Sequence, residues 1–274
     1  MTVRQRLALV GAAILVIGCA GVAISSNDLV WTSKPHKSAS GPQRIINFGG
    51  FFWKVRTSDG GAELPSSGAW SDSSDNVWID SNGALHLKVT VVNGHRVSAE
   101  VDSLTPFSYG TYRWKLKLDP NKLDLYTVLG LYTYGPSTRE NTPNEIDIEH
   151  GKFFSERRDG TASQFVVQPY KPSGHLFRFK VPAASIERIE QVTWTPRSID
   201  FKVLDAANPS GTPIAQWTFD KAAEVPVFRL DTLHMNFWSY DRGKPRTPPV
   251  NEAVIESFSF TPTVPTTLPA QSTK

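Results

Sequence analysis

The chain has 274 residues, of which 39% are hydrophobic and 11% aromatic, and its formal net charge is +3. That length suits one large β domain or two small ones, and the apolar content is ample for a core. The positive charge is small and dispersed, so we expect no nucleic-acid partner. The single cysteine, Cys19, excludes an intrachain disulfide and a cysteine-based metal cluster.

The N-terminal residues 1–18 have the pattern of an export signal. Arg4 and Arg6 precede an apolar run over residues 7–17, which is short for a membrane span. The run ends in Val-Ile-Gly-Cys, which resembles a bacterial lipobox, where the peptide is cut before the cysteine and the thiol of Cys19 is lipidated. An ordinary cleaved signal or an uncleaved anchor stays open. Each version predicts an exported protein, either a cell-envelope lipoprotein held at the membrane by its lipid or a secreted protein.

The composition divides the rest of the chain into three parts. Residues 19–44 are mixed polar and predict a flexible tether. Residues 45–260 carry the strand patterns and form the expected folded body. Residues 261–274 are rich in Thr and Pro and predict a disordered tail.

The first half of the body predicts strands and almost no helix. Residues 84–92 alternate between apolar and polar, and Asn-Gly at 82–83 and at 93–94 predicts a turn on either side. Residues 111–118 alternate again, with apolar side chains at even numbers, until Pro120 ends the run.

One heptapeptide in the middle of the chain, Asn-Glu-Ile-Asp-Ile-Glu-His, places three acids at alternate positions. Strand side chains alternate between the faces of a sheet, so Glu145, Asp147 and Glu149 share one face. Ile146 and Ile148 then point the other way, into a core. Because a row of like charges is costly, the pattern indicates cation binding or acid–base chemistry.

Three interpretations of the acid row compete. A solvated strand face is the simplest, but strands disfavour Asp. Calcium takes carboxylate ligands, although its loops are usually turns. The third is glycoside hydrolysis, in which retaining enzymes hold two carboxyl groups roughly 5–5.5 Å apart. Cα atoms four residues apart on a flat strand are about 13 Å apart. The two Glu side chains must therefore lean together over a concave face, with the middle Asp splitting their pKa values.

Later segments repeat the strand pattern. In residues 163–170, Gln164 and Gln168 share a face. Residues 191–204 predict strand, turn and strand. In residues 233–238 the odd-numbered side chains are apolar and go inward, while the even-numbered ones, which include an amide and a Trp, share the other face.

The pentad Glu-Ile-Asp-Ile-Glu resembles the active-site strand of glycoside hydrolase family 16, in the form without a β-bulge seen in lichenases and xyloglucan-active members. Further stretches resemble the family in the right order: Tyr109-Gly110, Tyr132-Thr133-Tyr134-Gly135-Pro136, Trp194-Thr195-Pro196 and Met235-Asn236-Phe237-Trp238. The resemblance covers roughly residues 45–260. It implies an all-β fold, a concanavalin A-like β-jelly-roll sandwich of two curved antiparallel sheets with a concave substrate cleft.

The resemblance also implies roles for single residues. Glu145 would be the nucleophile, Asp147 the assisting acid and Glu149 the general acid/base. The side chains expected to bind substrate are Tyr132, Tyr134, Gln164, Gln168, Asn236 and Trp238. Residues 137–144 are expected to form a polar loop beside the cleft.

The chain departs from the family pattern in three places. Arg113 and Lys115 stand where the family usually has Glu and Arg, and Pro143 replaces a Trp that many lichenases carry before the acids. Glu256 stands where an Asp often helps to bind a structural calcium. Calcium therefore stays open, and no cofactor is otherwise expected.

The sequence therefore predicts an exported retaining endo-β-glycosidase, a glycoside hydrolase acting on O-glycosyl bonds. Its partner would be a polysaccharide, either 1,3-1,4- or 1,3-β-glucan or an exopolysaccharide, and we expect a monomer. One alternative is a transglycosylase on the same scaffold, and another is a non-catalytic carbohydrate-binding surface lipoprotein.

Overall fold

The computed structural model describes residues 42–58, 61–139, 142–153, 160–240 and 251–263. The predicted export signal, Cys19 and nearly all of the predicted tether and tail lie outside these residues. No helix in the described ranges is long and apolar enough to cross a membrane. The side chain of Gln43 donates a 2.7 Å hydrogen bond to the carbonyl of Val55, so packing against the body starts slightly before residue 45.

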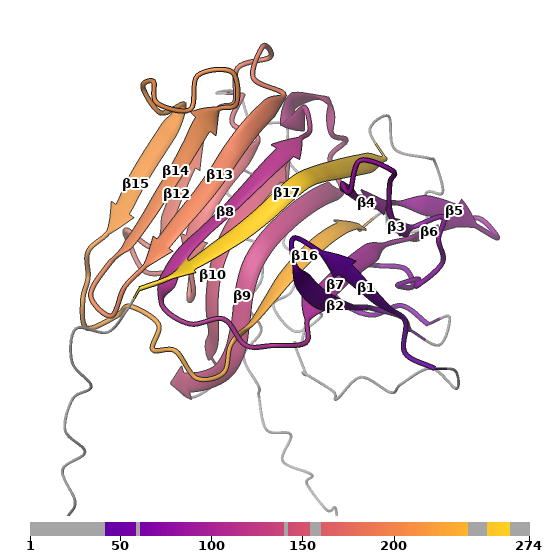
Figure 1. The fold of residues 1–274 in the computed structure, drawn as a ribbon, viewed down its shortest axis with the longest axis horizontal. Coiled ribbons are helices and arrows are strands. Elements are labelled where there is room, and N and C mark those ends of the chain that lie inside the picture. Colours follow the sequence, from indigo (N-terminus) through magenta and orange to yellow (C-terminus); the bar gives the residue numbers. More distant parts are fainter. Residues whose placement is uncertain (1–41, 59–60, 140–141, 154–159, 241–250, 264–274) are drawn as a thin grey trace, which may run out of the picture.

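Two antiparallel sheets make up the body (Figure 1). In spatial order the eight-stranded sheet contains β1 (Ile45–Phe48), β2 (Phe51–Val55), β7 (Ala99–Ser103), β16 (Thr232–Ser239), β9 (Thr127–Arg139), β10 (Thr142–Gly151), β11 (Ser163–Val167) and β12 (Leu176–Phe179). The seven-stranded sheet contains β15 (Ala215–Phe219), β14 (Ile199–Asp205), β13 (Glu187–Trp194), β8 (Gly110–Lys117), β17 (Glu252–Pro262), β4 (Leu85–Lys88) and β3 (Val77–Ile79). The remaining elements are the small pair β5 (Thr90–Val92) and β6 (His95–Val97) and the short 3-10 helix η1 (Pro120–Lys122).

The predicted alternation builds the core between the sheets. On β8 the side chains of Tyr112, Trp114 and Leu116 are buried, as their even numbering predicts. From the facing sheet, Phe165 stacks on Phe201 with ring centroids 4.8 Å apart. Figure 1 shows β8, β13 and β17 lying over β9, β10 and β16. The predicted all-β jelly-roll sandwich is confirmed.

Of the local predictions, one turn is confirmed, and one strand and one loop are wrong. At Asn93 and Gly94 both φ angles are positive, 50° and 78°, as a tight hairpin turn between β5 and β6 requires. The run over residues 84–92 is not one strand, because its ladder breaks at Val89, whose N–H bonds to the carbonyl of Asn251. The predicted polar loop over 137–144 is wrong, since β9 continues to Arg139 and β10 begins at Thr142.

Candidate active site

Strand β10 carries the acid row as the alternation predicts. Ile146 and Ile148 are buried between the sheets, at 3% and 0% exposure. Glu145, Asp147 and Glu149 therefore lie on the outer face of the eight-stranded sheet, which points away from the other sheet. On that face Asp147 is buried, and the two Glu residues are half-buried.

The neighbouring strands surround the acids in register. Directly opposite residues of antiparallel strands share a face. The pairs between β10 and its neighbours β9 and β11 are Glu145 with Tyr134, Asp147 with Tyr132, Glu149 with Gly130, and Glu149 with Gln164. Both tyrosines that were predicted to bind substrate thus lie on the acid face, and their role in binding stays a prediction.

Hydrogen bonds connect the acids to two amides. Gln164 donates to Glu149 through Nε2 and Oε2 at 2.7 Å, and Gln168 donates to Asp147 at 3.5 Å. The side chains of Glu145 and Asp147 are themselves hydrogen-bonded. Both predicted glutamines therefore face the acids, although they contact the carboxyl groups rather than open solvent.

The three carboxyl groups hold protons more strongly than free acids do. Burial raises the pKa of Glu145 to about 7, and the charge of Glu149 adds to that rise, against a hydrogen bond from Asp147. Burial and the charge of Glu145 raise the pKa of Asp147 well above its usual value. Burial also raises the pKa of Glu149, while the bond from Gln164 and the charge of Arg178 oppose it. The row therefore retains protons near neutral pH, as acid–base chemistry requires.

Asn236 and Trp238 lie on β16, beyond β9. They pair with Gly130 and Val128, so they share the acid face, as predicted. Asn236 is buried, and among the described residues its Oδ1 has no hydrogen-bond partner. The Oε1 atom of Gln164 is likewise a buried acceptor without a partner in the described part of the chain. Two free acceptors near Glu149 suit the hydroxyl donors of a sugar.

Sequence reasoning missed a charged cluster beside the acids. Glu100 is buried on β7 and accepts three hydrogen bonds, from Tyr132 at 2.9 Å, His234 at 2.9 Å and Arg56 at 2.7 Å. Burial works against ionisation, but the charge of Arg56 and the bond from His234 hold the pKa of Glu100 well below its usual range. Arg56 also stacks over Trp70 at 4.1 Å.

One signal for this cluster was present in the sequence. Glu100 stands between Ala99 and Val101, so a buried strand must turn an acid toward the other face. Its partners come from segments 44 and 134 residues away, and no local pattern joins them. The cluster fixes the phenol of Tyr132, which also lies opposite Asp147.

A second polar contact anchors the start of the acid strand. Asn144 precedes Glu145 and donates from Nδ2 to Asp231 and to the carbonyl of Val227, the latter at 3.0 Å. Asn144 pairs with Gly135 of β9. A Cβ atom at Gly135 would lie 2.1 Å from Asp231 Oδ1. The close approach of Asp231 therefore requires a glycine at position 135, in the Tyr-Gly-Pro stretch.

A third cluster lies behind the acids, inside the sandwich. His150, Glu190 and Arg188 are completely buried. Glu190 Oε1 lies 3.0 Å from His150 Nε2 and 2.5 Å from Arg188 Nε. Burial, and then the charge of Arg188, lower the pKa of His150. This charged group links β10 directly to β13 of the facing sheet.

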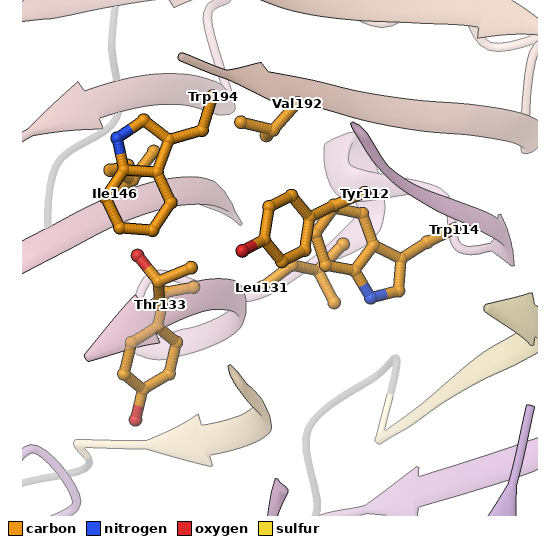
Figure 2. Close-up of a pocket in the computed structure, with 8 residues that line it drawn as sticks. Tyr112, Trp114, Leu131, Thr133, Ile146, Val192 and Trp194 are labelled. Carbon is orange, nitrogen blue, oxygen red and sulfur yellow. The ribbon is translucent and has the colours of Figure 1, made fainter. Parts of the chain in front are cut away.

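Two cavities of the described structure lie away from the acids. Figure 2 shows one between the sheets, where Tyr112, Trp114 and Trp194 face Leu131 and Ile146. Its volume of about 10 Å³ is at the lower limit for one water molecule, so it is no substrate site. A larger hollow of about 280 Å³ lies on the seven-stranded sheet, around residues 184–187 and 205–207. The predicted concave cleft over the acids stays a prediction.

Clusters of metal-ligating side chains are absent from the described ranges. No group there of three or more His, Cys, Asp or Glu side chains could hold an ion. Glu256, which stands at the position associated with calcium, forms a 2.6 Å ion pair with Lys115. Lys115 is one of the two basic residues at which this chain departs from the family pattern, and its charge is paired with Glu256.

Solved structures share this fold. The Bacillus licheniformis β-glucanase matches with a TM-score of 0.56 and 19% identity, over 81% of this chain and 99% of that one. A Bacteroides ovatus family 16 endo-glucanase, solved with G4G3G-2F-DNP, matches with a TM-score of 0.59 and 14% identity, over 76% and 94%. Rv0315 of Mycobacterium tuberculosis, described as an immunostimulatory antigen and pseudo β-1,3-glucanase, matches with a TM-score of 0.55 and 16% identity, over 77% and 91%.

These likenesses establish the fold: the chain adopts the sandwich of the family 16 glucanases. No protein-family model matches the sequence, and no curated protein matches it significantly. The chain spans nearly the whole length of the solved structures that it resembles. The class of fold that the resemblance implied is thereby confirmed.

Proposed function

We propose that the protein is a retaining endo-β-glycosidase that hydrolyses a β-glucan-like polysaccharide. The observation that carries the proposal is the row of three proton-retaining carboxyl groups on one face of β10, with amides and phenols around it. The β-glucanase and endo-glucanase names of the structural neighbours support the substrate class. A purely structural role would not need three acids that resist ionisation.

The proposed reaction has two displacements. The carboxylate of Glu145 attacks the anomeric carbon while protonated Glu149 gives its proton to the departing glycosidic oxygen. The products are a glycosyl ester on Glu145 and a free chain end. Water then attacks the same carbon, Glu149 takes its proton, and the ester bond to Glu145 breaks. Asp147, hydrogen-bonded to Glu145, stabilises the carboxylate between the steps.

Residues around the acids would hold the sugar. Tyr132, Tyr134 and Trp238 offer aromatic faces, and Asn236 and Gln164 offer free acceptor atoms. The candidate substrates remain 1,3-1,4-β-glucan, 1,3-β-glucan and an exopolysaccharide. No cofactor is part of the proposal, and a monomer suffices for it.

The test is the release of reducing ends from a panel of lichenan, laminarin, xyloglucan, agarose and exopolysaccharide. We expect release from one glycan, and a loss of at least about 10²-fold in Glu145→Gln and in Glu149→Gln. Glu187→Gln, an exposed acid on the other sheet, is the matched control. If either acid variant keeps a rate within about tenfold of the parent, the assignment of the acids is wrong.

A second candidate is a carbohydrate-binding surface protein without turnover. The description of Rv0315 as a pseudo β-1,3-glucanase is the observation that favours it, because this fold therefore does not guarantee hydrolysis. Binding to a glycan without any release of reducing ends would support this candidate. A transglycosylase would instead yield longer oligosaccharides, which chromatography of the products would separate from hydrolysis.

Export and lipidation belong to the proposal as well. The apolar run after Arg4 and Arg6 and the lipobox-like sequence at Cys19 support an envelope lipoprotein. Expression of the full chain and of Cys19→Ser in a bacterial host tests this. We expect the parent to partition with membranes and the variant to be released or to keep its precursor mass.

A further inference from the structure

Exposed apolar side chains gather at one end of the eight-stranded sheet. Seven large hydrophobic residues in the described part of the chain are exposed. Three of them are at or beside the ends of β2, β7 and β16 that lie near Glu145: Phe52, Leu104 and Leu230. A fourth, Val227, accepts a hydrogen bond at its carbonyl from Asn144, the neighbour of Glu145. Phe52 is the only aromatic among the seven, and its exposure is 59%. Exposed apolar side chains that gather in one region indicate a contact site.

Phe52 points to the same side of the sheet as the acids. Its neighbour Trp53 is fully buried between the sheets, so Phe52 and Lys54 face outward. Lys54 is the first residue of a row of opposite residues that runs across five strands to Asp147: Lys54, Asp102, His234, Tyr132 and Asp147. The outer face is therefore continuous from β2 to β10.

The next row contains Phe52 and the proposed nucleophile. Glu145 pairs with Tyr134, which pairs with Thr232. Directly after β7 the matching position is Leu104, whose N–H donates to the carbonyl of Phe52 at 3.0 Å. Strands lie about 4.8 Å apart, so the four spacings between β2 and β10 separate Phe52 from Glu145 by roughly 19 Å.

We propose that Phe52 is a remote binding platform for the same polysaccharide chain, several sugar units away from the bond that is cut. The proposal rests on the proposed function, since it extends that site along the sheet. A flat apolar ring stacks well on the C–H face of a pyranose. Lys54 on the same face and the exposed Asn47, which pairs with Phe52, supply donors for hydroxyl groups.

A polysaccharide fits this surface better than a globular partner does. Phe52 and Leu104 lie on one row that continues through Thr232 and Tyr134 to Glu145, and the polar residues Asn47 and Lys54 lie beside Phe52. An extended chain can contact Phe52 and Glu145 at once, whereas a short oligosaccharide bound at the acids cannot reach β2. The platform should therefore act on long substrates alone.

The experiment compares Phe52→Ala and Phe52→Trp with the parent on a β-glucan polymer and on its oligosaccharides in increasing lengths. We expect Phe52→Ala to raise KM for the polymer and the longest oligosaccharides about three- to tenfold, with kcat unchanged. Short oligosaccharides should be cut as by the parent, and Phe52→Trp should restore the polymer KM. Val92→Ala, an exposed side chain on the small pair of strands, is the control.

Binding is measured separately in the Glu145→Gln background, by electrophoresis through gels that contain each glycan of the panel. Retardation that weakens on adding Phe52→Ala supports the platform even if the parent hydrolyses nothing, in which case only the hydrolase proposal fails. Hydrolysis with no effect of Phe52→Ala on the polymer, or with equal effects on short and long substrates, overturns the platform alone. No retardation by any glycan also overturns it.

Discussion

Gln164 lies directly opposite Glu149 in the pairing of β11 with β10, and its amide donates a 2.7 Å hydrogen bond to that carboxyl group. The bond favours the ionised form of Glu149, whereas burial favours the protonated form. A general acid must keep its proton until the leaving group needs it. The balance between burial and this one amide should therefore set the alkaline limit of activity.

Replacing Gln164 by Met removes the donor and keeps the length of the side chain. The pKa of Glu149 should rise, since only burial and the charge of Arg178 then act on it. The alkaline limb of the kcat/KM profile should move to higher pH, because the acid stays protonated longer. Gln191→Met, on the outer face of the other sheet, should leave the limb in place. An alkaline limb that stays still or moves to lower pH in Gln164→Met would contradict this account.

Glu145 should make the stability of the native protein depend on pH. Burial raises its native pKa to about 7 from the ordinary value of 4.5. Below 4.5 both states bind the proton, and there is no penalty. Between about pH 4.5 and pH 7, Glu145 is ionised in the unfolded chain but still protonated in the native state. The free energy of unfolding therefore falls as the pH rises through this range.

The variant Glu145→Gln cannot ionise and should escape this loss. Its free energy of unfolding, relative to the parent, should grow by roughly 1–3 kcal/mol between pH 5 and pH 8. Urea titrations at both pH values measure the difference. Glu187→Gln, an exposed acid, should show no such change. A gain that is the same at both pH values would show that Glu145 ionises as freely in the native state as in the unfolded chain.

The ion pair between Arg56 and Glu100 gives a prediction on stability. Arg56→Met leaves the carboxylate of Glu100 buried with His234 and Tyr132 as its remaining donors. Removing one partner of a buried ion pair costs about 3–5 kcal/mol. The loss should be largest at neutral pH and should shrink below pH 4.5, where the unfolded chain takes up a proton that native Glu100 resists.

Urea unfolding of Arg56→Met against Lys117→Met measures this loss. Lys117 pairs with Glu187 on the surface at 3.2 Å, and that exposed pair should be worth no more than about 1 kcal/mol. Equal losses in the two variants would mean that the buried cluster adds nothing beyond an ordinary surface pair.

The contrast between the acid strand and the first hairpin explains what the sequence could predict. In β10 a strict alternation of acids with Ile146 and Ile148 fixes both the strand and its faces. Residues 45–55 yielded no predicted strand, because Phe51, Phe52 and Trp53 are all aromatic and show no alternation. The burial of Trp53 in the folded sandwich, and not a pattern in the sequence, shows that Phe52 faces outward.

Local sequence patterns likewise could not predict which residues of distant strands lie opposite each other. The pentad and the Tyr-Gly-Pro stretch are close in sequence, and their pairing follows from one hairpin. By contrast, Glu100 contacts Tyr132 only because β16 lies between β7 and β9, which is a property of the whole sheet. The buried group of His150, Glu190 and Arg188 depends in the same way on how the two sheets face each other.

Gly130 gives the last prediction, because it leaves the space that Asn236 occupies beside Glu149. A Cβ atom at residue 130 would lie 2.6 Å from Asn236 Oδ1, which is too close for either to stay in place. Gly130→Ala should therefore displace the amide and lower kcat/KM about 10- to 100-fold, since small misplacements of positioning groups cost that much. The free energy of unfolding should fall by only about 1–3 kcal/mol.

Two further variants isolate the cause. Gly61→Ala, where an added Cβ meets nothing within 4 Å, should retain full activity. If the clash with Asn236 is the whole effect, Gly130→Ala combined with Asn236→Ala should be no less active than Asn236→Ala alone. A double variant that is much less active than Asn236→Ala would mean that Gly130 itself must admit the sugar beside Glu149, and that the amide is not the group displaced.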